Sequence, residues 1–197
     1  MYFYKLNINN LTTDQKEDIR SKFPKRYWKA VNYRFDRDKL RCIGAYVLLE
    51  QAFPNFKEND ILYSEYGKPY FKLGLRFNYS HSGDYVVLVT DNDEVGIDVE
   101  QIREKDFKIM RRCFTEKEFA WIEEKNSTER FLKLWCKKES LLKLFGLGLA
   151  MRMNEIDVLN LNENKPTIIF DKEVYNKTFV ENHHVISISS FNKPDFN

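Results

Sequence analysis

The chain of 197 residues has only three cysteines, Cys42, Cys113 and Cys136, and no CxxC pair. An odd number of cysteines without metal-ligand spacing argues against a disulfide framework or a structural zinc site, and favours a reducing cytoplasm. No run approaches roughly 18 apolar residues, which excludes a membrane-spanning helix. The first ten residues also lack the apolar core of a signal peptide. We therefore expect a cytoplasmic protein that does not associate with membranes.

A strong net charge is also missing, since the formal charge is only +2. The sequence therefore lacks the global field that attracts nucleic acid. The charge is unevenly spread, because nine basic and two acidic residues lie between Arg20 and Arg41, with five aromatic residues among them. This basic stretch is either a solvated helical face or a phosphate-binding surface, and RNA would fit the same pattern.

The composition is that of a folded globular protein, with 43% hydrophobic and 31% charged residues, and the length allows one large domain or two small ones. Turn and capping signals divide the chain into an α+β pattern that occurs roughly twice, with a break near residue 100. Asp14 and Glu17 resemble a capping box. Strands are predicted at 2–8, 61–66, 77–80, 85–90, 95–100, 155–159, 166–171, 174–181 and 184–190. Helices are predicted at 14–22, 36–51, 106–112, 115–125 and from 127 or 128 to 145. The strands at 85–90 and 95–100 are expected to form a hairpin.

The segment Gly96-Ile97-Asp98-Val99-Glu100 is the first of three that carry reactive side chains. On a strand, Asp98 and Glu100 project from the same face, and two neighbouring carboxylates repel unless a cation lies between them. Mg²⁺ is typically held by one or two carboxylates together with substrate phosphates. The alternative is a strand that ends in two exposed acids.

The second segment is WCKKESLLK at 135–143, in which Trp135, Glu139 and Lys143 are spaced four apart on one helical face. Glu139 and Lys143 are either an ordinary helical ion pair, worth about 0.2–0.5 kcal/mol, or a carboxylate for metal or base chemistry with an ammonium beside it.

The third segment is FNYSHSG at 77–83, where His81 stands between Ser80 and Ser82 before a glycine. Such a loop offers hydroxyls, amides and an imidazole to an anion, or it is a polar turn with a satisfied histidine. His183 and His184 are interpreted as structural.

Together with Tyr66-Gly67-Lys68-Pro69 and Phe114-Thr115-Glu116-Lys117-Glu118-Phe119, these segments follow one another in a specific order. With this order and spacing, from about residue 64 to 148, the sequence resembles the 4′-phosphopantetheinyl transferases of the surfactin-synthetase-activating type. The resemblance implies two similar α+β halves, 1–100 and 101–197, related by pseudo-twofold symmetry around an active-site cleft. It also implies transfer of the phosphopantetheine arm of coenzyme A to a serine of an apo acyl or peptidyl carrier protein, with release of 3′,5′-ADP.

The resemblance assigns roles residue by residue. It makes Asp98, Glu100 and Glu139 the magnesium ligands, with Glu139 also the general base. Lys143 steadies the pyrophosphate. The coenzyme A contacts that it implies are Lys25, Lys68, Pro69, Ser80, His81 and Lys143. Lys29 is a weaker match for a further contact.

One position departs from the family pattern. The arginine usually found four residues before the helix glycine, here Gly44, is replaced by Leu40. Lys39 and Arg41 flank that position, so either of these cations is a substitute, with Arg41 the preferred candidate, or the helix register is shifted by one residue. A bidentate arginine clamp is not freely replaced by lysine.

Two other functions compete with this interpretation. A Mg²⁺-dependent nuclease would use spaced acids with a glutamate and lysine, but such cores usually carry the last acid and lysine two apart on a strand. A non-catalytic coenzyme A-binding module would have little reason to hold repelling acids together. The carrier remains open, and the apolar residues Ile102, Phe107, Ile109 and Met110 are either its docking surface or part of the core. We expect a monomer, because a two-half protein completes its own cleft.

Overall fold

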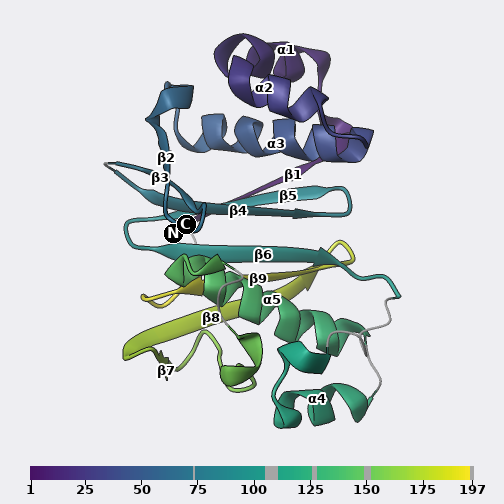
Figure 1. The fold of residues 1–197 in the computed structure, drawn as a ribbon, viewed down its shortest axis with the longest axis vertical. Helices are drawn as coiled ribbons and strands as arrows, with labels where there is room; N and C mark the ends of the chain where they lie inside the picture. The colour runs from purple at the N-terminus through teal and green to yellow at the C-terminus, as the bar shows by residue number, and fades with distance from the viewer. Residues whose placement is uncertain (73, 105–110, 126–127, 149–151, 196–197) are drawn as a thin grey trace.

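The computed structural model describes residues 1–72, 74–104, 111–125, 128–148 and 152–195. Its helices and strands form two stacked α+β layers (Figure 1). The helices are α1 (Thr13–Lys22), α2 (Pro24–Val31), α3 (Asp36–Ala52), α4 (Glu116–Glu123) and α5 (Thr128–Phe145). The strands are β1 (Tyr2–Asn7), β2 (Ile61–Tyr63), β3 (Pro69–Phe71), β4 (Arg76–Ser82), β5 (Tyr85–Asp91), β6 (Val95–Gln101), β7 (Thr167–Ile169), β8 (Lys172–Glu181) and β9 (His184–Ser190). None of the described helices has the length and apolar character that crossing a bilayer demands.

The described strands form three antiparallel sheets. The first sheet has the order β1-β5-β4 and lies under α1, α2 and α3, and the second has the order β6-β9-β8-β7 and lies against α5 (Figure 1). The third is the short β2-β3 pair. This arrangement confirms a mixed α+β fold, and it places the two larger sheets next to each other at β4, β5 and β6.

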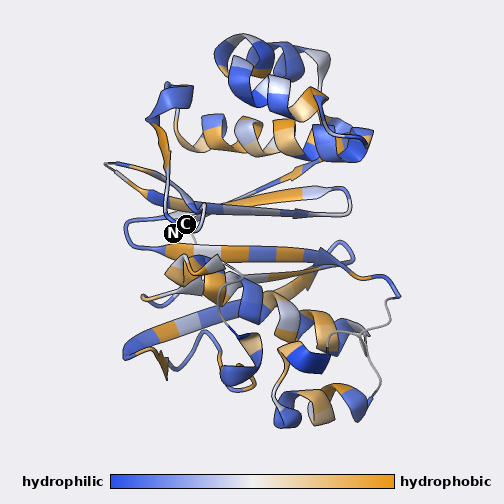
Figure 2. Ribbon diagram, in the orientation of Figure 1, coloured by the Kyte–Doolittle hydropathy of each residue, from blue (hydrophilic) through white to orange (hydrophobic). Residues whose placement is uncertain are grey.

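Each layer has its own hydrophobic core, and a third cluster joins the layers. Leu48 and Leu88 belong to the first core, between the α1–α3 helices and the first sheet. The second core lies between α4, α5 and the second sheet. The joining cluster contains Val89 of β5 with Ile97 and Val99 of β6. Hydrophobic and hydrophilic residues alternate along β6 (Figure 2), so one face of the strand packs and the other carries polar groups.

Most predicted elements are present within a few residues of the expected bounds, including the helix at 36–51 and the capping box at Thr115 and Glu118. The predicted hairpin of 85–90 with 95–100 is wrong. Both edges of β5 are taken by β1 and β4, and β6 pairs with β9. The sheets therefore divide between Asp91 and Val95, ahead of the break expected near residue 100.

Two further expectations are wrong, and a third falls mostly outside the described residues. The capping box of α1 is formed by Thr12 and Gln15, not by Asp14 and Glu17, because the helix begins at Thr13. The strand expected at 155–159 is a 3₁₀ turn (Met153–Glu155) followed by a loop. Most of the helix expected at 106–112 falls outside the described residues, as do Phe107, Ile109 and Met110, whereas Ile102 packs against the second core. Helix α2 was not predicted from the sequence.

Candidate active site

Polar side chains of β4 connect the two sheets. The Oδ1 atom of Asn78 accepts a hydrogen bond from the backbone N–H of Ile97 at 3.0 Å, and Oγ of Ser82 accepts one from the N–H of Gln101 at 3.1 Å. Strands β4 and β6 have no backbone ladder between them, so these side chains satisfy the edge of β6. The seam between the layers is therefore lined by hydrophilic groups.

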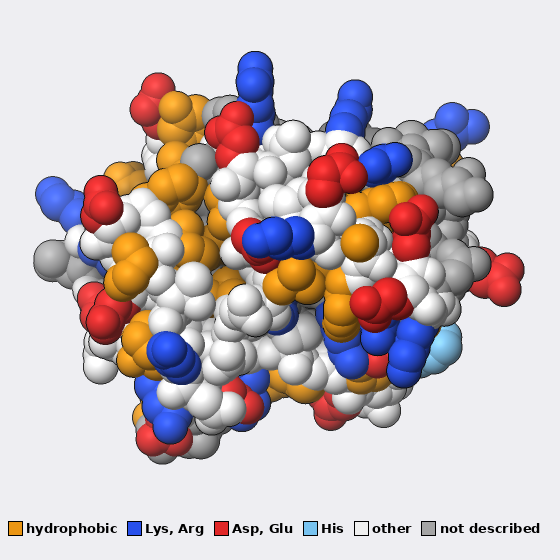
Figure 3. Space-filling view, turned by 90° about the horizontal axis from the view of Figure 1, so that it is seen from below, with side chains coloured by type: hydrophobic (Ala, Val, Ile, Leu, Met, Phe, Trp, Pro, Cys, Tyr) orange, Lys and Arg blue, Asp and Glu red, His pale blue; other side chains and the backbone are white. Residues whose placement is uncertain are grey.

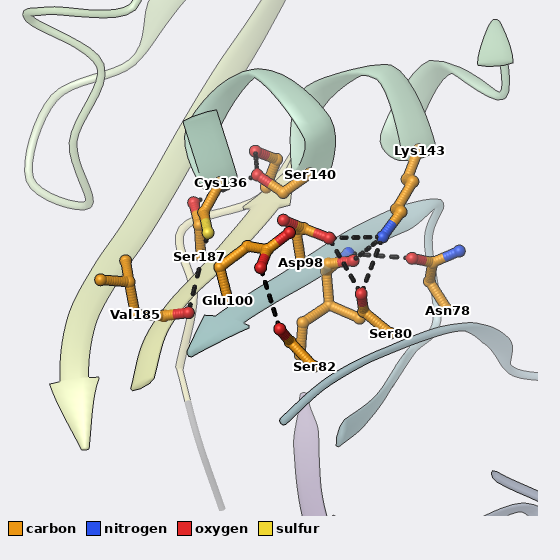
Figure 4. A network of polar contacts seen from close by, with 12 residues as sticks. Asn78, Ser80, Ser82, Asp98, Glu100, Cys136, Ser140, Lys143, Val185 and Ser187 are labelled. Atoms are coloured by element: carbon orange, nitrogen blue, oxygen red, sulfur yellow. Dashed lines mark hydrogen bonds and ion pairs between the residues drawn. The ribbon is translucent and has the colours of Figure 1, made fainter. Parts of the chain in front are cut away.

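The two acids of β6 lie on this seam, on the same face of the strand (Figure 4). Ser80 Oγ donates to Asp98 Oδ1 at 2.9 Å, and Ser82 Oγ donates to Glu100 Oε2 at 2.9 Å. The sequence prediction that Asp98 and Glu100 share a face is thereby confirmed. Two serines of β4 hold two acids of β6 in matching register.

Lys143 reaches the same point from the last turns of α5. Its Nζ donates to Asp98 Oδ1 at 2.7 Å, to Ser80 Oγ at 3.0 Å and to the backbone carbonyl of Ile97 at 3.1 Å (Figure 4). Three segments far apart in the sequence thus meet at one ammonium group, on β4, β6 and α5. Such a group is suited to binding a polyanion.

The second oxygen of Asp98, Oδ2, is buried and has no hydrogen-bond partner within the part of the chain that the structure describes. Burial raises the pKa of Glu139, and the negative charges of Asp98 and Glu100 raise it further, whereas Lys143 lowers it. Burial is the largest cause that raises the pKa of the Cys136 thiol, and the charges of the same two acids raise it further. Glu139 and the acids of β6 therefore act on one another electrostatically.

These groups suit a divalent cation in part. The donors are hard carboxylate oxygens, of the kind that Mg²⁺ prefers, and a buried acceptor without a partner is a free coordination position. Among the described residues, however, no three or more His, Cys, Asp or Glu side chains are gathered closely enough to form a metal site as they stand. Lys143 instead provides the positive charge beside Asp98. The residues therefore fit the ion by the chemistry of their donor atoms.

Helix α5 approaches β6 unusually closely at Gly96. A Cβ atom placed on Gly96 would lie 2.0 Å from the carbonyl oxygen of Ser140 and 2.4 Å from the backbone nitrogen of Leu144. Only glycine permits this approach. Because Ser140 and Leu144 directly follow Glu139 and Lys143 in the chain, Gly96 sets the distance between these two side chains and β6.

A buried network of hydroxyls fixes α5 against the second sheet. Ser140 Oγ lies 3.1 Å from Ser187 Oγ and 2.9 Å from Ser189 Oγ on β9, and Asn176 of β8 donates to both serines at 2.8 and 2.9 Å. Every member has partners, which is the condition under which a buried polar network specifies one arrangement.

Two further lysines of the 135–143 segment hold α5 from its other side. Lys138 and Glu118 form an ion pair at 2.8 Å with side chains only 1% and 0% exposed, and Lys138 also donates to the Met153 carbonyl at 2.8 Å. Lys137 Nζ donates to three backbone carbonyls between residues 158 and 161. These lysines are structural, a role that the sequence pattern did not distinguish from that of Lys143.

A cavity of about 240 Å³ opens beside Lys143. It is lined by Tyr66, Gly67, Lys68, Pro69, Asn78, Tyr79, Leu142, Lys143, Gly146 and Gly148. The structure thus brings together Lys68, Pro69 and Lys143, which the resemblance had grouped. The ammonium of Lys68 itself donates to Glu94 at 2.6 Å and to the Leu144 carbonyl at 3.0 Å, so it is the stem of Lys68 that lines the cavity.

Of the other predicted anion contacts, His81 and Arg41 lie at the end of β4 and the turn after it, whereas Lys25 lies away from them on another element. The side chain of His81 is exposed. The protein around its ring lowers the pKa of His81, and the positive charges of Arg41 and Lys143 lower it further. Arg41 is engaged: it donates to the Gly83 carbonyl at 2.6 and 2.9 Å and to Asp38 at 2.9 Å. Lys25 lies on α2 and donates to Asn59 at 3.0 Å.

Sequence reasoning missed several residues of this arrangement. Asn78 and Ser82 belong to the segment at 77–83, but no role was predicted for either residue. The alternation of side chains along β4 places both on the same side as Ser80. Gly96 carried a usable signal, a glycine inside a strand, which often marks a close approach of another backbone. No signal in the sequence pairs Glu118 with Lys138.

The fold and the site define an α+β protein with an acidic, lysine-containing site at the seam between two sheets. Residues 94–189 match the model of the 4′-phosphopantetheinyl transferase superfamily, and this part of the chain belongs to that superfamily. The matched segment begins at β6 and carries Asp98, Glu100, Glu139 and Lys143. The resemblance drawn from the sequence motifs is thereby confirmed.

Curated relatives extend the similarity beyond that segment. The chain is 35% identical over 135 residues to the 4′-phosphopantetheinyl transferase gsp of Aneurinibacillus migulanus, covering 61% of this chain and 57% of the relative. It is 34% identical over 108 residues to the 4′-phosphopantetheinyl transferase Sfp of Bacillus subtilis, covering 51% and 48%. It is 30% identical over 164 residues to an L-aminoadipate-semialdehyde dehydrogenase-phosphopantetheinyl transferase of Pongo abelii, covering 71% and 52%. The chain spans about half the length of the curated relatives that it matches.

Proposed function

We propose that this protein transfers the 4′-phosphopantetheine arm of coenzyme A to a serine of an apo carrier protein. The observation that carries the proposal is the seam site, where Lys143 pairs with Asp98 and Glu100 lies on the same face of β6. One buried Asp98 oxygen has no partner among the described residues. Paired acids with an adjacent ammonium suit a reaction at a pyrophosphate, and the superfamily match spans these residues.

Asp98, Glu100 and Glu139 would hold the metal ion. Bound Mg²⁺ supplies positive charge to the pyrophosphate oxygens as negative charge builds on the leaving phosphate. The ammonium of Lys143 acts on the same oxygens and is kept in place by Ser80. Ser80 therefore contributes by orienting Lys143, in addition to any contact of its own with phosphate.

The 240 Å³ cavity is proposed to take the nucleotide end of coenzyme A. The stem of Lys68, the ring of Pro69 and Leu142 of α5 are among the groups that line it. His81 is assigned the 3′-phosphate, because its exposed ring lies within the electrostatic influence of Arg41 and Lys143. Lys25 and Arg41 are assigned to the same anion, Arg41 at the cost of its present contacts with Asp38 and Gly83.

The chemical step moves one group and one proton. The oxygen of the carrier serine forms a bond to the phosphorus that bears pantetheine, the bond from that phosphorus to the bridging oxygen breaks, and 3′,5′-ADP leaves. Glu139 accepts the serine proton directly or through a water molecule.

We further propose that the chain consists of two similar halves with pseudo-twofold symmetry, 1–100 and 101–197, in which β6 at the end of the first half joins the sheet of the second layer. We also propose that the protein acts as a monomer in the cytoplasm. In each layer one long helix, α3 or α5, packs on an antiparallel sheet. In support of a monomer, the seam residues already meet within one chain.

The alternatives have less support. A nuclease core would place its last acid and lysine on a strand, whereas Glu139 and Lys143 lie on α5. A binding module without catalysis would leave the convergence of Asp98, Glu100 and Lys143 without a purpose.

The test is mass spectrometry of an apo carrier protein incubated with this protein, coenzyme A and Mg²⁺. We expect the carrier to gain one phosphopantetheine group, and a chelator or Asp98→Ala to abolish the gain. Circular dichroism checks that Asp98→Ala still folds. Transfer that survives in the presence of chelator contradicts the role of the acids, and carrier that never gains mass contradicts the proposed activity.

A further inference from the structure

The segment from Trp28 to Arg37 presents large aromatic side chains to solvent. The exposed fractions are 67% for Trp28, 61% for Phe35 and 40% for Tyr33. These three rings fall within a short stretch of the chain, and exposed apolar surface of this kind marks interaction sites. Trp, Tyr and Arg are the residue types that dominate binding energy at protein interfaces. The segment runs from the end of α2 through the connection to the first turn of α3, and it is called here the aromatic–basic loop. We infer that it is a docking surface for an acidic protein. The inference rests on the proposed function, because that protein is the carrier.

The loop has a defined shape. The side chain of Asn32 donates to the Trp28 carbonyl at 2.9 Å, and the N–H of Tyr33 donates to the Ala30 carbonyl at 3.0 Å. The guanidinium of Arg34 lies 5.3 Å from the ring centroid of Phe35. A surface that is ordered before binding loses less conformational entropy on association.

The charge of the loop selects the partner. Within the part of the chain that the structure describes, Lys29 and Arg34 form no ion pair, whereas Asp36 is neutralised by Lys39 at 2.9 Å. The free charges on this surface are therefore positive. An acidic partner would be steered toward it, and its exposed carboxylates would find cations that are not already engaged.

The loop is tied to the edge of the seam site. Arg37 Nε lies 3.2 Å from an oxygen of Asp84, and Arg41 holds the carbonyl of Gly83. This turn directly follows Ser82, which holds Glu100. The start of α3, the β4–β5 turn and the end of β6 lie on the same side of the molecule (Figure 1). A protein bound at the loop would therefore stand beside the end of β6 that carries Glu100.

The same features favour protein over nucleic acid. A nucleic acid gains affinity from each phosphate that a cation neutralises, and the loop offers two unpaired cations between exposed rings. The face at the other end of the molecule does not continue this basic surface, because positive and negative side chains are interspersed there (Figure 3).

The experiment compares three variants of the full chain, Trp28→Ala, Phe35→Ala and Arg34→Glu, with two controls. Ile168→Ala removes a side chain that is 65% exposed, and Lys165→Glu reverses an exposed charge, both in the second layer. With an acidic apo carrier as substrate, each loop variant should raise the KM for carrier about tenfold. The kcat and the KM for coenzyme A should stay at the wild-type values, and Arg34→Glu should also weaken the salt dependence. The controls should match the wild type.

Circular dichroism establishes that each variant is folded, which these exposed positions lead us to expect. Wild-type transfer with an unchanged carrier KM in all three loop variants overturns the docking inference and leaves the proposed function intact. If the wild type transfers nothing, the proposed function fails, and titration of carrier against the labelled wild type and Trp28→Ala still decides whether the loop binds it. Binding of a single-stranded RNA oligonucleotide that the loop variants lose, with carrier affinity unchanged, replaces the inference with a nucleic-acid surface.

Discussion

The substitution Gly96→Ala probes the feature on which the site geometry most depends, the close approach of α5 to β6. The added carbon would lie 2.0 Å from the Ser140 carbonyl oxygen, 2.4 Å from the Leu144 nitrogen and 3.0 Å from the Leu144 Cα. All three are backbone atoms of a helix, so no rotamer change relieves the overlap. The helix must retreat by about 1 Å or more to restore an ordinary contact.

Two effects follow from that retreat. Overpacking of a well-packed core costs about 1–3 kcal/mol of unfolding free energy, and a clash with rigid backbone places Gly96→Ala at the upper end of that range or beyond it. The displacement also separates Lys143 from Asp98, now 2.7 Å apart, and moves Glu139 with it. Misplacement of catalytic groups by 1 Å costs roughly 100-fold in rate.

Gly44→Ala is the matched control. A Cβ on Gly44 would meet only side-chain methyl groups, Leu6 Cδ2 at 3.1 Å and Val86 Cγ2 at 3.3 Å, which have room to adjust. Alanine also favours the helix there by up to about 1 kcal/mol. Urea unfolding followed by circular dichroism measures stability, and mass spectrometry of the carrier measures kcat. A Gly96→Ala protein as stable and as active as Gly44→Ala would refute this account of how α5 is positioned.

Two other predictions concern the lysines that precede Glu139. Lys138→Met leaves Glu118 buried without its cation, with only the backbone N–H groups of Thr115 and Val158 donating to it. This loss should lower the unfolding free energy by about 3–5 kcal/mol, and adding Glu118→Gln should restore part of it. Urea unfolding that shows no recovery in the double variant would contradict the pairing. Burial lowers the pKa of Lys137 from 10.5 to about 8. The unfolded chain keeps this proton to higher pH than the folded chain does. The unfolding free energy of the wild type should therefore rise between about pH 8 and 10 relative to that of Lys137→Met. Parallel curves of unfolding free energy against pH for the two proteins would contradict the burial of the Lys137 charge.

Alternation and capping made most of the fold predictable. The same-face placement of Asp98 and Glu100 follows from the period of a strand, and helix α3 follows from the spacing of its apolar residues. These are local properties, set by neighbours a few residues away. The capping box at Thr115 and Glu118 is local in the same way.

The failures have a common cause, which is long-range pairing. The short turn after β5 favoured a hairpin, but β6 finds its partner in β9, about 90 residues later in the chain, and no local signal records that choice. The loop at 155–159 reads as a strand because Ile156 and Val158 are apolar. Those residues pack into the second core, and the backbone carbonyls of this loop instead accept from Lys137 and Lys138.

The sequence motifs named Ser80, Asp98, Glu100 and Lys143, which meet at the seam, but they did not give the arrangement of these residues. Each segment of the site belongs to a different element, and the seam forms only because β4 and β6 are both edge strands of their sheets. Edge strands expose unpaired backbone groups, which proteins must cover. Here Asn78 and Ser82 cover them with side chains. Because a side-chain bridge leaves more room than a backbone ladder, the requirement to satisfy two sheet edges is what opens a polar site between them.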